Sequence, residues 1–187
     1  MKQTPNSPAK LHSRQTKIKP KKPIWRHLLE IALLLVVVFG ILWWQERHLL
    51  SRDDKPLAPS QQLISLDEKR YQIPAAGQKQ LLYFFAPWCK ICRFSIGNIE
   101  AQKPALLKKG FQVRYVALDW QNKTEVAAFA KEQKLTFPVL MGTLETMQQY
   151  QVQGFPTYYL VDEQGRISAG SQGYSTSLGI WLRSLNN

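Results

Sequence analysis

A continuous apolar segment divides this 187-residue chain into two very different parts. It covers residues 24–44, and no charged residue occurs between Ile31 and Trp44. A helix of about 20 apolar residues matches the roughly 30 Å hydrocarbon core of a bilayer. Tryptophans stand at both ends of the segment, where side chains meet the membrane interface. We therefore predict a single transmembrane helix over 24–44.

Two other interpretations of this segment were weighed against the membrane helix. A cleaved signal peptide needs a small-x-small site after the apolar run, whereas here the run ends in Trp43 and Trp44, and the polar stretch QERH follows. A core helix of a soluble domain is normally amphipathic, whereas this segment is apolar on all sides. Both comparisons favour the membrane helix.

Basic residues are concentrated at the N-terminus. The whole chain has 25 Lys and Arg against 13 Asp and Glu, and residues 1–30 hold eight basic residues and a single acid, Glu30. Residues 1–23 also contain four prolines and few large apolar residues, which predicts a disordered tail. Positive charge favours the cytoplasmic side. We therefore expect the tail in the cytoplasm and residues 45–187 outside the inner membrane of a bacterium, in the periplasm or beyond it.

The basic tail does not indicate a nucleic-acid-binding protein. Proteins that bind single-stranded nucleic acid interleave basic residues with aromatic side chains that stack on bases, and residues 1–23 contain no aromatic residue. The charge fits a topology signal and contact with anionic lipid. We therefore expect the bilayer, and no nucleic acid, as a partner.

The exported part reads as a polar linker, 45–61, followed by one α/β domain, 62–187. Hydrophobic patterns predict alternating elements. Strands are expected within 63–73 (two short ones) and at 81–86, 111–118, 137–141, 157–162 and 166–173. Helices are expected at 89–109, 123–133, 143–150 and 175–185. This alternation predicts a sheet covered by helices on both faces, and about 125 residues suffice for one core.

The only two cysteines, Cys89 and Cys92, follow the apolar strand and begin a helix. Unpaired N–H groups and the helix dipole at a helix N-terminus lower the pKa of a thiol, and Lys90 adds positive charge. The thiolate is the form that attacks a disulfide. We therefore predict that Cys89 is the outer, attacking sulfur and that Cys92, one turn inward, resolves the mixed disulfide.

Three alternatives to a redox-active pair remain open. The first is a static disulfide, although so short a loop restricts the unfolded chain only slightly. The second is a pair of reduced cysteines in the core. The third is a copper(I) or zinc site, although all three histidines, His12, His27 and His48, precede the domain. A copper-handling accessory and a non-catalytic binding domain with an inert disulfide are thus the rival functions.

Two segments resemble a known family. FFAPWCKIC (84–92) is similar to the active-site segment of thioredoxins, and GFPTYYLVDEQGRI (154–167) is similar to their cis-proline segment. The apolar helix, the 63–73 hairpin and FPVLM (137–141) resemble the membrane-anchored TlpA-like, or ResA-like, branch. The resemblance covers about residues 60–187. It implies a thioredoxin-like fold, a central mixed sheet flanked by helices.

The resemblance also implies an activity and a site. It implies a protein-disulfide oxidoreductase that needs no dissociable cofactor or metal. Its partners would be cysteine-containing exported proteins and a membrane electron donor or acceptor. Pro156 would be the cis-proline that faces the Cys89–Cys92 pair. The residues that would contact substrate are Trp88, Lys90, Ile91, Phe155 and Pro156.

The sequence departs from the family at three places. Tyr83 stands where thioredoxins have a buried Asp, and Ser95 stands where TlpA-like haem-maturation reductants usually have a Glu. The residues between the cysteines are Lys90 and Ile91. No proton acceptor for Cys92 is evident, so we expect a more oxidising couple than that of thioredoxin.

Overall fold

The computed structural model describes residues 24–46, 49–50 and 55–186, without the side chains at 24, 26, 42–46 and 186. The expected disordered tail, residues 1–23, lies outside them. The chain divides into two units, Met1–Phe39 and Gly40–Asn187. Helix α1 covers Ile24–Glu46, and its described side chains are exposed. Among the described residues, no helix meets the length and apolarity required of a membrane span.

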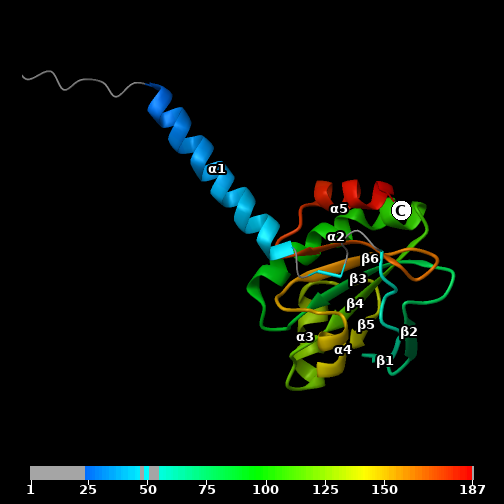
Figure 1. Cartoon of the computed structure of the whole chain (residues 1–187). Coiled ribbons are helices and arrows are strands. Elements are labelled where there is room, and N and C mark those ends of the chain that lie inside the picture. The colour runs from blue at the N-terminus through cyan, green and yellow to red at the C-terminus, as the bar shows by residue number, and fades with distance from the viewer. Residues whose placement is uncertain (1–23, 47–48, 51–54, 187) are drawn as a thin grey trace, which may run out of the picture. The chain divides into compact units, whose positions relative to one another are not determined.

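The second unit is built on one seven-stranded sheet with the strand order β2-β1-β5-β4-β3-β6-β7 (Figure 1). β3, β4 and β5 are mutually parallel, and all other neighbouring pairs are antiparallel. The sheet is therefore mixed, as expected. The strands are β1 (Gln61–Ser65), β2 (Arg70–Ile73), β3 (Lys79–Phe85), β4 (Phe111–Ala117), β5 (Val139–Met141), β6 (Thr157–Val161) and β7 (Ile167–Gln172).

Strand β3 lies near the centre of the sheet and is buried on both faces. Leu81, Tyr83 and Phe85 point into one core cluster, and Leu82 and Phe84 into a second one on the opposite face. A strand covered on both sides needs a continuous apolar run rather than an alternating pattern. This confirms the prediction made from LLYFFA, and it fixes the position of the cysteines that follow.

Helices cover both faces, as predicted. α2 (Lys90–Lys108), α3 (Lys123–Glu132) and α5 (Ser177–Arg183) contribute buried side chains to the first cluster. α4 (Leu144–Gln149) contributes Met147 to the second. The expected last helix, 175–185, is shorter in the structure and continues as a 3-10 turn, Ser184–Asn186.

The predicted linker, 45–61, is part of folded structure wherever the structure describes it. Its first two residues complete α1, and Leu49 is buried in the second core cluster. The N–H of Ala58 donates to the carbonyl oxygen of Gly165 at 2.8 Å. The prediction rested on the polar composition of this range, whereas burial of Leu49 and Ala58 and pairing with the distant hairpin turn decide its structure.

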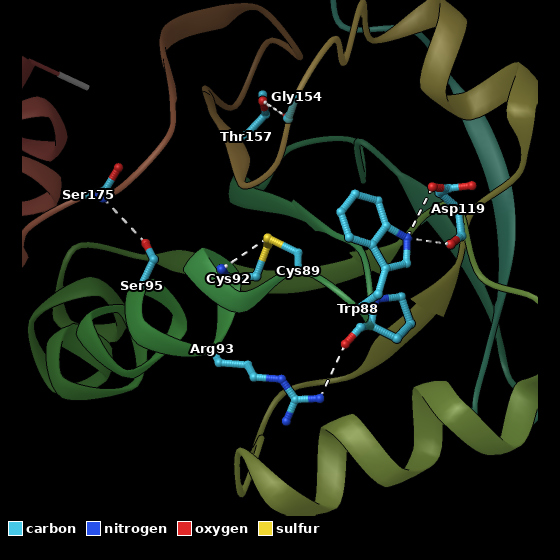
Figure 2. The surroundings of a disulfide bond; sticks show 10 residues. Trp88, Cys89, Cys92, Arg93, Ser95, Asp119, Gly154, Thr157 and Ser175 are labelled. Carbon is cyan, nitrogen blue, oxygen red and sulfur yellow. Dashed lines mark hydrogen bonds between the residues drawn. A yellow bond between two sulfur atoms is a disulfide. The ribbon is translucent and has the colours of Figure 1, made fainter.

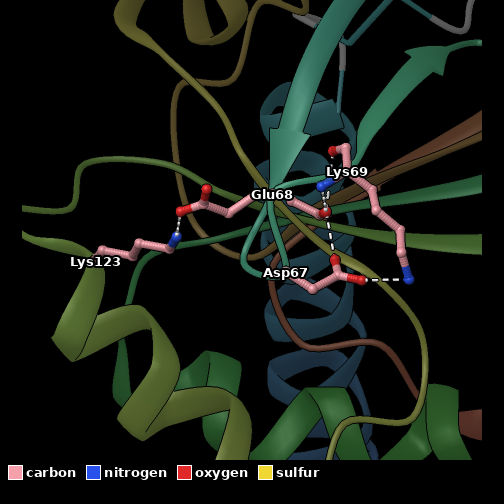
Figure 3. A network of polar contacts seen from close by, with 5 residues as sticks. Asp67, Glu68, Lys69 and Lys123 are labelled. Atoms are coloured by element: carbon pink, nitrogen blue, oxygen red, sulfur yellow. Dashed lines mark hydrogen bonds and ion pairs between the residues drawn. The ribbon is translucent and has the colours of Figure 1, made fainter.

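The turn between β1 and β2 is closed by a small polar network (Figure 3). The N–H of Lys69 donates to Oγ of Ser65 at 3.1 Å, and Lys69 Nζ lies 2.7 Å from Oδ2 of Asp67. Glu68 pairs with Lys123 at the start of α3, with 2.8 Å between Oε1 and Nζ. The Lys123 ammonium lowers the pKa of Glu68. Because these groups are exposed, the pair orients the hairpin and adds little stability.

Replacing glycine with alanine is expected to have opposite effects on stability at Gly142 and at Gly97. A Cβ at Gly142 would lie 2.6 Å from Cδ2 of Leu118 and 3.0 Å from the carbonyl oxygen of Ala117. A Cβ at Gly97, exposed within α2, meets nothing within 4 Å. We expect Gly142→Ala to destabilise by about 1–3 kcal/mol and Gly97→Ala to stabilise by about 0.5–1 kcal/mol. Urea unfolding of both variants checks this, and equal changes would contradict it.

Candidate active site

Cys89 is the N-cap residue of α2 and forms a disulfide with Cys92 (Figure 2). The N–H of Cys92 donates to Sγ of Cys89 at 3.1 Å. This N–H belongs to the first turn of the helix, where backbone donors have no partner within the helix. The same donor would stabilise a thiolate on Cys89 after reduction. The sequence prediction placed the pair at this helix start, and the structure has it there.

The two cysteines differ in accessibility. Cys89 is 5% exposed, whereas Cys92 is fully buried in the first core cluster. An attacking thiol of a partner protein therefore reaches Cys89 more easily. This arrangement agrees with the expected roles of Cys89 as the outer sulfur and Cys92 as the resolving one.

Trp88 forms an exposed wall beside the disulfide and is held by a carboxylate. Its side chain is 61% exposed. Its Nε1–H donates to both the carbonyl oxygen and Oδ2 of Asp119, at 3.2 Å and 3.1 Å (Figure 2). Asp119 follows β4 with a positive φ of 49°. The hydrogen bonds to Asp119 thus fix the orientation of the Trp88 indole.

Phe155 and Pro156 come to the same end of the sheet because β6 pairs with β3 in antiparallel register. The chain leaves β3 toward Cys89 and enters β6 from Pro156. The Phe155–Pro156 peptide bond is cis, as the resemblance implies, and Pro156 is buried. The rings of Phe155 and Trp88 meet edge to face, with centroids 5.8 Å apart.

Lys90 and Ile91 occupy the first turn of α2 and are both exposed. The neighbouring cation, Arg93, is engaged elsewhere, because it pairs with Glu132 and lies over the ring of Phe129. Lys90 is therefore the cation next to Cys89 that faces solvent. Five predicted site residues, Trp88, Lys90, Ile91, Phe155 and Pro156, thus lie on segments that adjoin the disulfide.

Below the disulfide, hydroxyl groups occupy the places where the family has carboxylates. Tyr83 is buried on β3, and its hydroxyl makes no hydrogen bond to any residue that the structure describes. Burial raises the pKa of Tyr83, and the nearby side chain of Ser95 offsets this only in part. Ser95 accepts a hydrogen bond from the N–H of Ser175 at 3.3 Å (Figure 2). Tyr83 is therefore neutral near pH 7, a hydrogen-bond donor rather than a base.

The site has no further groups suited to a metal. Within the described part of the chain, no three His, Cys, Asp or Glu side chains gather in an arrangement that could hold an ion.

Beyond Asp119 there is a cavity of about 330 Å³, lined by Asp119, Trp120, Gly142, Thr143, Leu144 and Met147. Its walls are mostly apolar, so the cavity suits an uncharged side chain.

Sequence reasoning missed Asp119 as a partner of Trp88. A signal was present, because β3 and β4 are parallel neighbours whose carboxyl ends lie at the same edge of the sheet, and ligands of such sheets bind at that edge. The loop after 111–118 was therefore a candidate from the outset. The partners of Ser95 carried no signal, because they depend on how the last helix packs.

The chain is similar to proteins of known families. Residues 57–169 match the model of the AhpC/TSA family. The sporulation thiol-disulfide oxidoreductase A of Bacillus subtilis is 28% identical over 151 residues, which is 79% of this chain and 92% of that protein. The thioredoxin-like protein YneN of the same species is 30% identical over 73% of this chain and 84% of its own length.

Solved structures agree with these relatives. The crystal structure of StoA from Bacillus subtilis superposes with a TM-score of 0.60 at 26% identity, over 68% of this chain and 98% of that one. A putative thiol:disulfide interchange protein DsbE from Chlorobium tepidum superposes with a TM-score of 0.65 at 26% identity, over 72% and 97%. The expected thioredoxin-like fold is confirmed.

Proposed function

Since the chain belongs to the AhpC/TSA family and is a thiol-disulfide oxidoreductase of thioredoxin fold, we propose that it works while anchored in a bacterial inner membrane. Its substrates in this proposal are cysteines of exported proteins. The observation that carries the proposal is the disulfide at the N-terminus of α2, where Cys89 is more accessible than Cys92 and follows Trp88, whose ring meets that of Phe155.

The exchange has two steps that balance without any cofactor. A substrate thiolate attacks Sγ of Cys89, the Cys89–Cys92 bond breaks, and the electron pair leaves on Cys92. A second substrate thiolate then attacks its own mixed-disulfide sulfur and releases Cys89 as a thiolate. The substrate gains a disulfide, and the enzyme gains two electrons. Run in reverse, the same steps reduce a substrate disulfide at the expense of the dithiol.

The residues around Cys89 have distinct roles in this proposal. The exposed side chains of Trp88 and Ile91 and the partly buried ring of Phe155 provide apolar contact to the chain that carries the substrate cysteine. Pro156 borders the same position. Lys90 and the helix N-terminus stabilise the Cys89 thiolate. A separate membrane protein would restore the starting redox state of the pair.

The anchor in this proposal is α1. Most of its described side chains are large and apolar, and all of them are exposed, which in water would be unfavourable. The strongly basic residues before it favour a cytoplasmic N-terminus. These two observations support a single-pass protein whose redox domain lies outside the cytoplasm.

We expect a membrane-impermeant maleimide to label the reduced cysteine pair in intact spheroplasts. The chain is expressed at full length, and the pair is first reduced with a permeant dithiol. Unlabelled chain in spheroplasts, with labelling only after lysis, would contradict the export. A cytoplasmic thiol protein in the same cells serves as the control for lysis. Extraction of the protein by carbonate without detergent would contradict the anchor.

A further inference from the structure

The outward face of α2 lacks charge over most of its length. Every exposed position between Lys90 and Lys108 is uncharged, and these positions are Ile91, Phe94, Gly97, Ala101, Pro104 and Leu107. Their spacing of three or four residues places them on one face of the helix. A surface helix normally turns charged and polar residues toward water. At 1.5 Å per residue, the face from Ile91 to Leu107 is about 24 Å long.

Helix α5 lies beside α2 and widens this surface (Figure 1). Asn98 of α2 joins the two segments, because its Nδ2 donates to the hydroxyl of Tyr174 at 3.1 Å and to the carbonyl oxygen of Ser175 at 2.8 Å. Leu178 follows and is 63% exposed, and Leu182 lies one turn further. We call Ile91, Phe94, Tyr174, Leu178 and Leu182 the α2–α5 patch.

Exposed apolar residues of the domain concentrate on this surface. Among the described residues after α1, twelve large hydrophobic side chains are exposed, and nine of these are Trp88 or lie on or beside α2 and α5. Single exposed apolar residues are ordinary, but a contiguous patch marks an interaction site. Phe94 is 76% exposed, the most of the twelve. A large exposed aromatic side chain is a typical anchor of a protein interface.

The rim of the patch is basic. The exposed cations of α2 are Lys90 and Lys108, one at each end, whereas Arg93 pairs with Glu132 and Lys103 donates to Oγ1 of Thr136. The only acid on α2 and α5 is Glu100. Glu100 is turned away from the patch, because its carboxylate accepts hydrogen bonds from Tyr115 and Thr136. The complementary surface is therefore apolar at its centre and acidic at its edge.

We propose that the α2–α5 patch docks the redox partner of the enzyme, a protein with an apolar, acid-rimmed contact surface that carries the thiols or disulfide exchanging with Cys89. The proposal rests on the proposed function. The patch begins at Ile91, two residues from Cys89, so a protein seated on it also reaches the sulfur. Small residues at Gly97, Ala101 and Pro104 allow close approach of a partner helix.

The length of the patch separates this occupant from an extended substrate segment. Such a segment is held next to the disulfide and needs no surface 24 Å long, whereas a folded partner typically covers about 800 Å² on each side.

The test measures how fast the reduced full-length protein reacts with three disulfide probes. Each probe carries one cysteine joined to 2-nitro-5-thiobenzoate, and attack by the Cys89 thiolate releases this group as a coloured thiolate. The first probe is a helical peptide with a leucine face and glutamate flanks, and the second replaces its glutamates with lysines. The third is glutathione. Rates are measured in about 10 mM and about 1 M salt, where the Debye length is about 30 Å and about 3 Å.

We expect the acidic helix to react about tenfold faster than its lysine twin in low salt and equally fast in high salt. Phe94→Ser and Leu178→Ser should each lower the rate of the acidic helix about fivefold, the effect of losing one interface anchor. The matched control is Leu57→Ser, because Leu57 is 65% exposed but lies outside the patch. None of the three variants should change the rate with the glutathione probe.

Other results would overturn the proposal. These are equal rates for the two helices in low salt, a faster lysine twin, or equal effects of Leu178→Ser and Leu57→Ser. If the faster reaction of the acidic helix disappeared when anionic vesicles were added, the patch would be assigned to lipid. If it became weaker as the protein concentration was raised, the patch would be assigned to a second copy of the chain. A Phe94→Ser variant that is equally slow with glutathione would indicate damage to the disulfide site. If wild type released no thiol from any probe, the proposed function itself would fail.

Discussion

Replacing Cys92 with alanine is expected to trap the enzyme as a mixed disulfide between Cys89 and a substrate cysteine. Cys89 is the more accessible sulfur and Cys92 is buried behind it, so Cys89 takes up the substrate and Cys92 releases it. Without Cys92 the first bond still forms, but the fast intramolecular release is lost. The adduct is detected on non-reducing gels and by the added mass on the Cys89 peptide.

Cys89→Ala separates this prediction from an ordinary loss of function. It removes the accessible nucleophile, so exchange should fall by at least about 1000-fold, and no adduct should form even though Cys92 remains. Neither variant should unfold, because a disulfide that spans three residues contributes little stability. Trapping by Cys89→Ala and not by Cys92→Ala would reverse the assigned roles, and normal turnover of both would remove the pair from the mechanism.

The Cys89–Cys92 couple is expected to be more oxidising than thioredoxin, with a reduction potential well above about −270 mV. A couple is oxidising when its reduced form is stabilised. The N–H of Cys92 donates to Sγ of Cys89 at 3.1 Å, and the cation of Lys90 is adjacent. No carboxylate occurs from Leu81 to Gly97. Equilibration with glutathione measures the potential, and a value at or below that of thioredoxin would contradict the expectation.

Two variants test which groups set this potential. Lys90→Glu should lower it by about 20 mV, the equivalent of about 1 kcal/mol. Lys108→Glu makes the same charge change at the far end of α2, about 27 Å away at 1.5 Å per residue, and should leave the potential unchanged because salt screens so distant a charge. Equal shifts in the two variants would show that net charge, and not the environment of Cys89, controls the couple.

The buried Tyr83 gives a further test of what sets the reduction potential of the Cys89–Cys92 couple. A buried carboxylate near Cys92 could accept the proton of its thiol, and while ionised it would disfavour a thiolate by charge repulsion. Tyr83 is neutral because burial raises its pKa. Tyr83→Asp should therefore change how the rate of mixed-disulfide release depends on pH. Tyr115→Phe is the matched control, because Tyr115 faces the same core cluster but its hydroxyl is bonded to Glu100 at 2.7 Å.

The sequence predicted the elements whose position depends on the hydrophobicity of a short segment. LLYFFA (81–86) is continuously apolar, and β3 is buried on both faces. The start of α2 was predicted from its position after that strand, and Cys89 is indeed its N-cap. The packing of Leu49 in the second core cluster was not predicted, because the polar composition of 45–61 gives no sign of it. The cis bond at Ile73–Pro74 was not predicted either.

The site was predictable to the same extent. Cys89, Cys92 and Pro156 stand in short motifs, and the structure has the disulfide and the cis peptide bond at these positions. The hydrogen bond from Trp88 to Asp119 joins residues 31 positions apart and depends on the register of β3 and β4. The α2–α5 patch could not be predicted, because the sequence of 89–109 does not show which of its apolar residues are buried. The exposed face of α2 is recognisable only once burial has been assigned residue by residue.

The antiparallel pairing of β3 with β6 also has a consequence for biosynthesis. Cys89 precedes Pro156 by 67 positions, and contacts between segments so far apart form late, because a long loop must close first. While the ribosome still holds the residues after about 150, the two cysteines are present without Phe155 and Pro156. During that interval the pair is an ordinary dithiol, open to oxidation by whatever meets it first. Disulfide exchange selective for substrates therefore begins only when almost the whole chain has emerged.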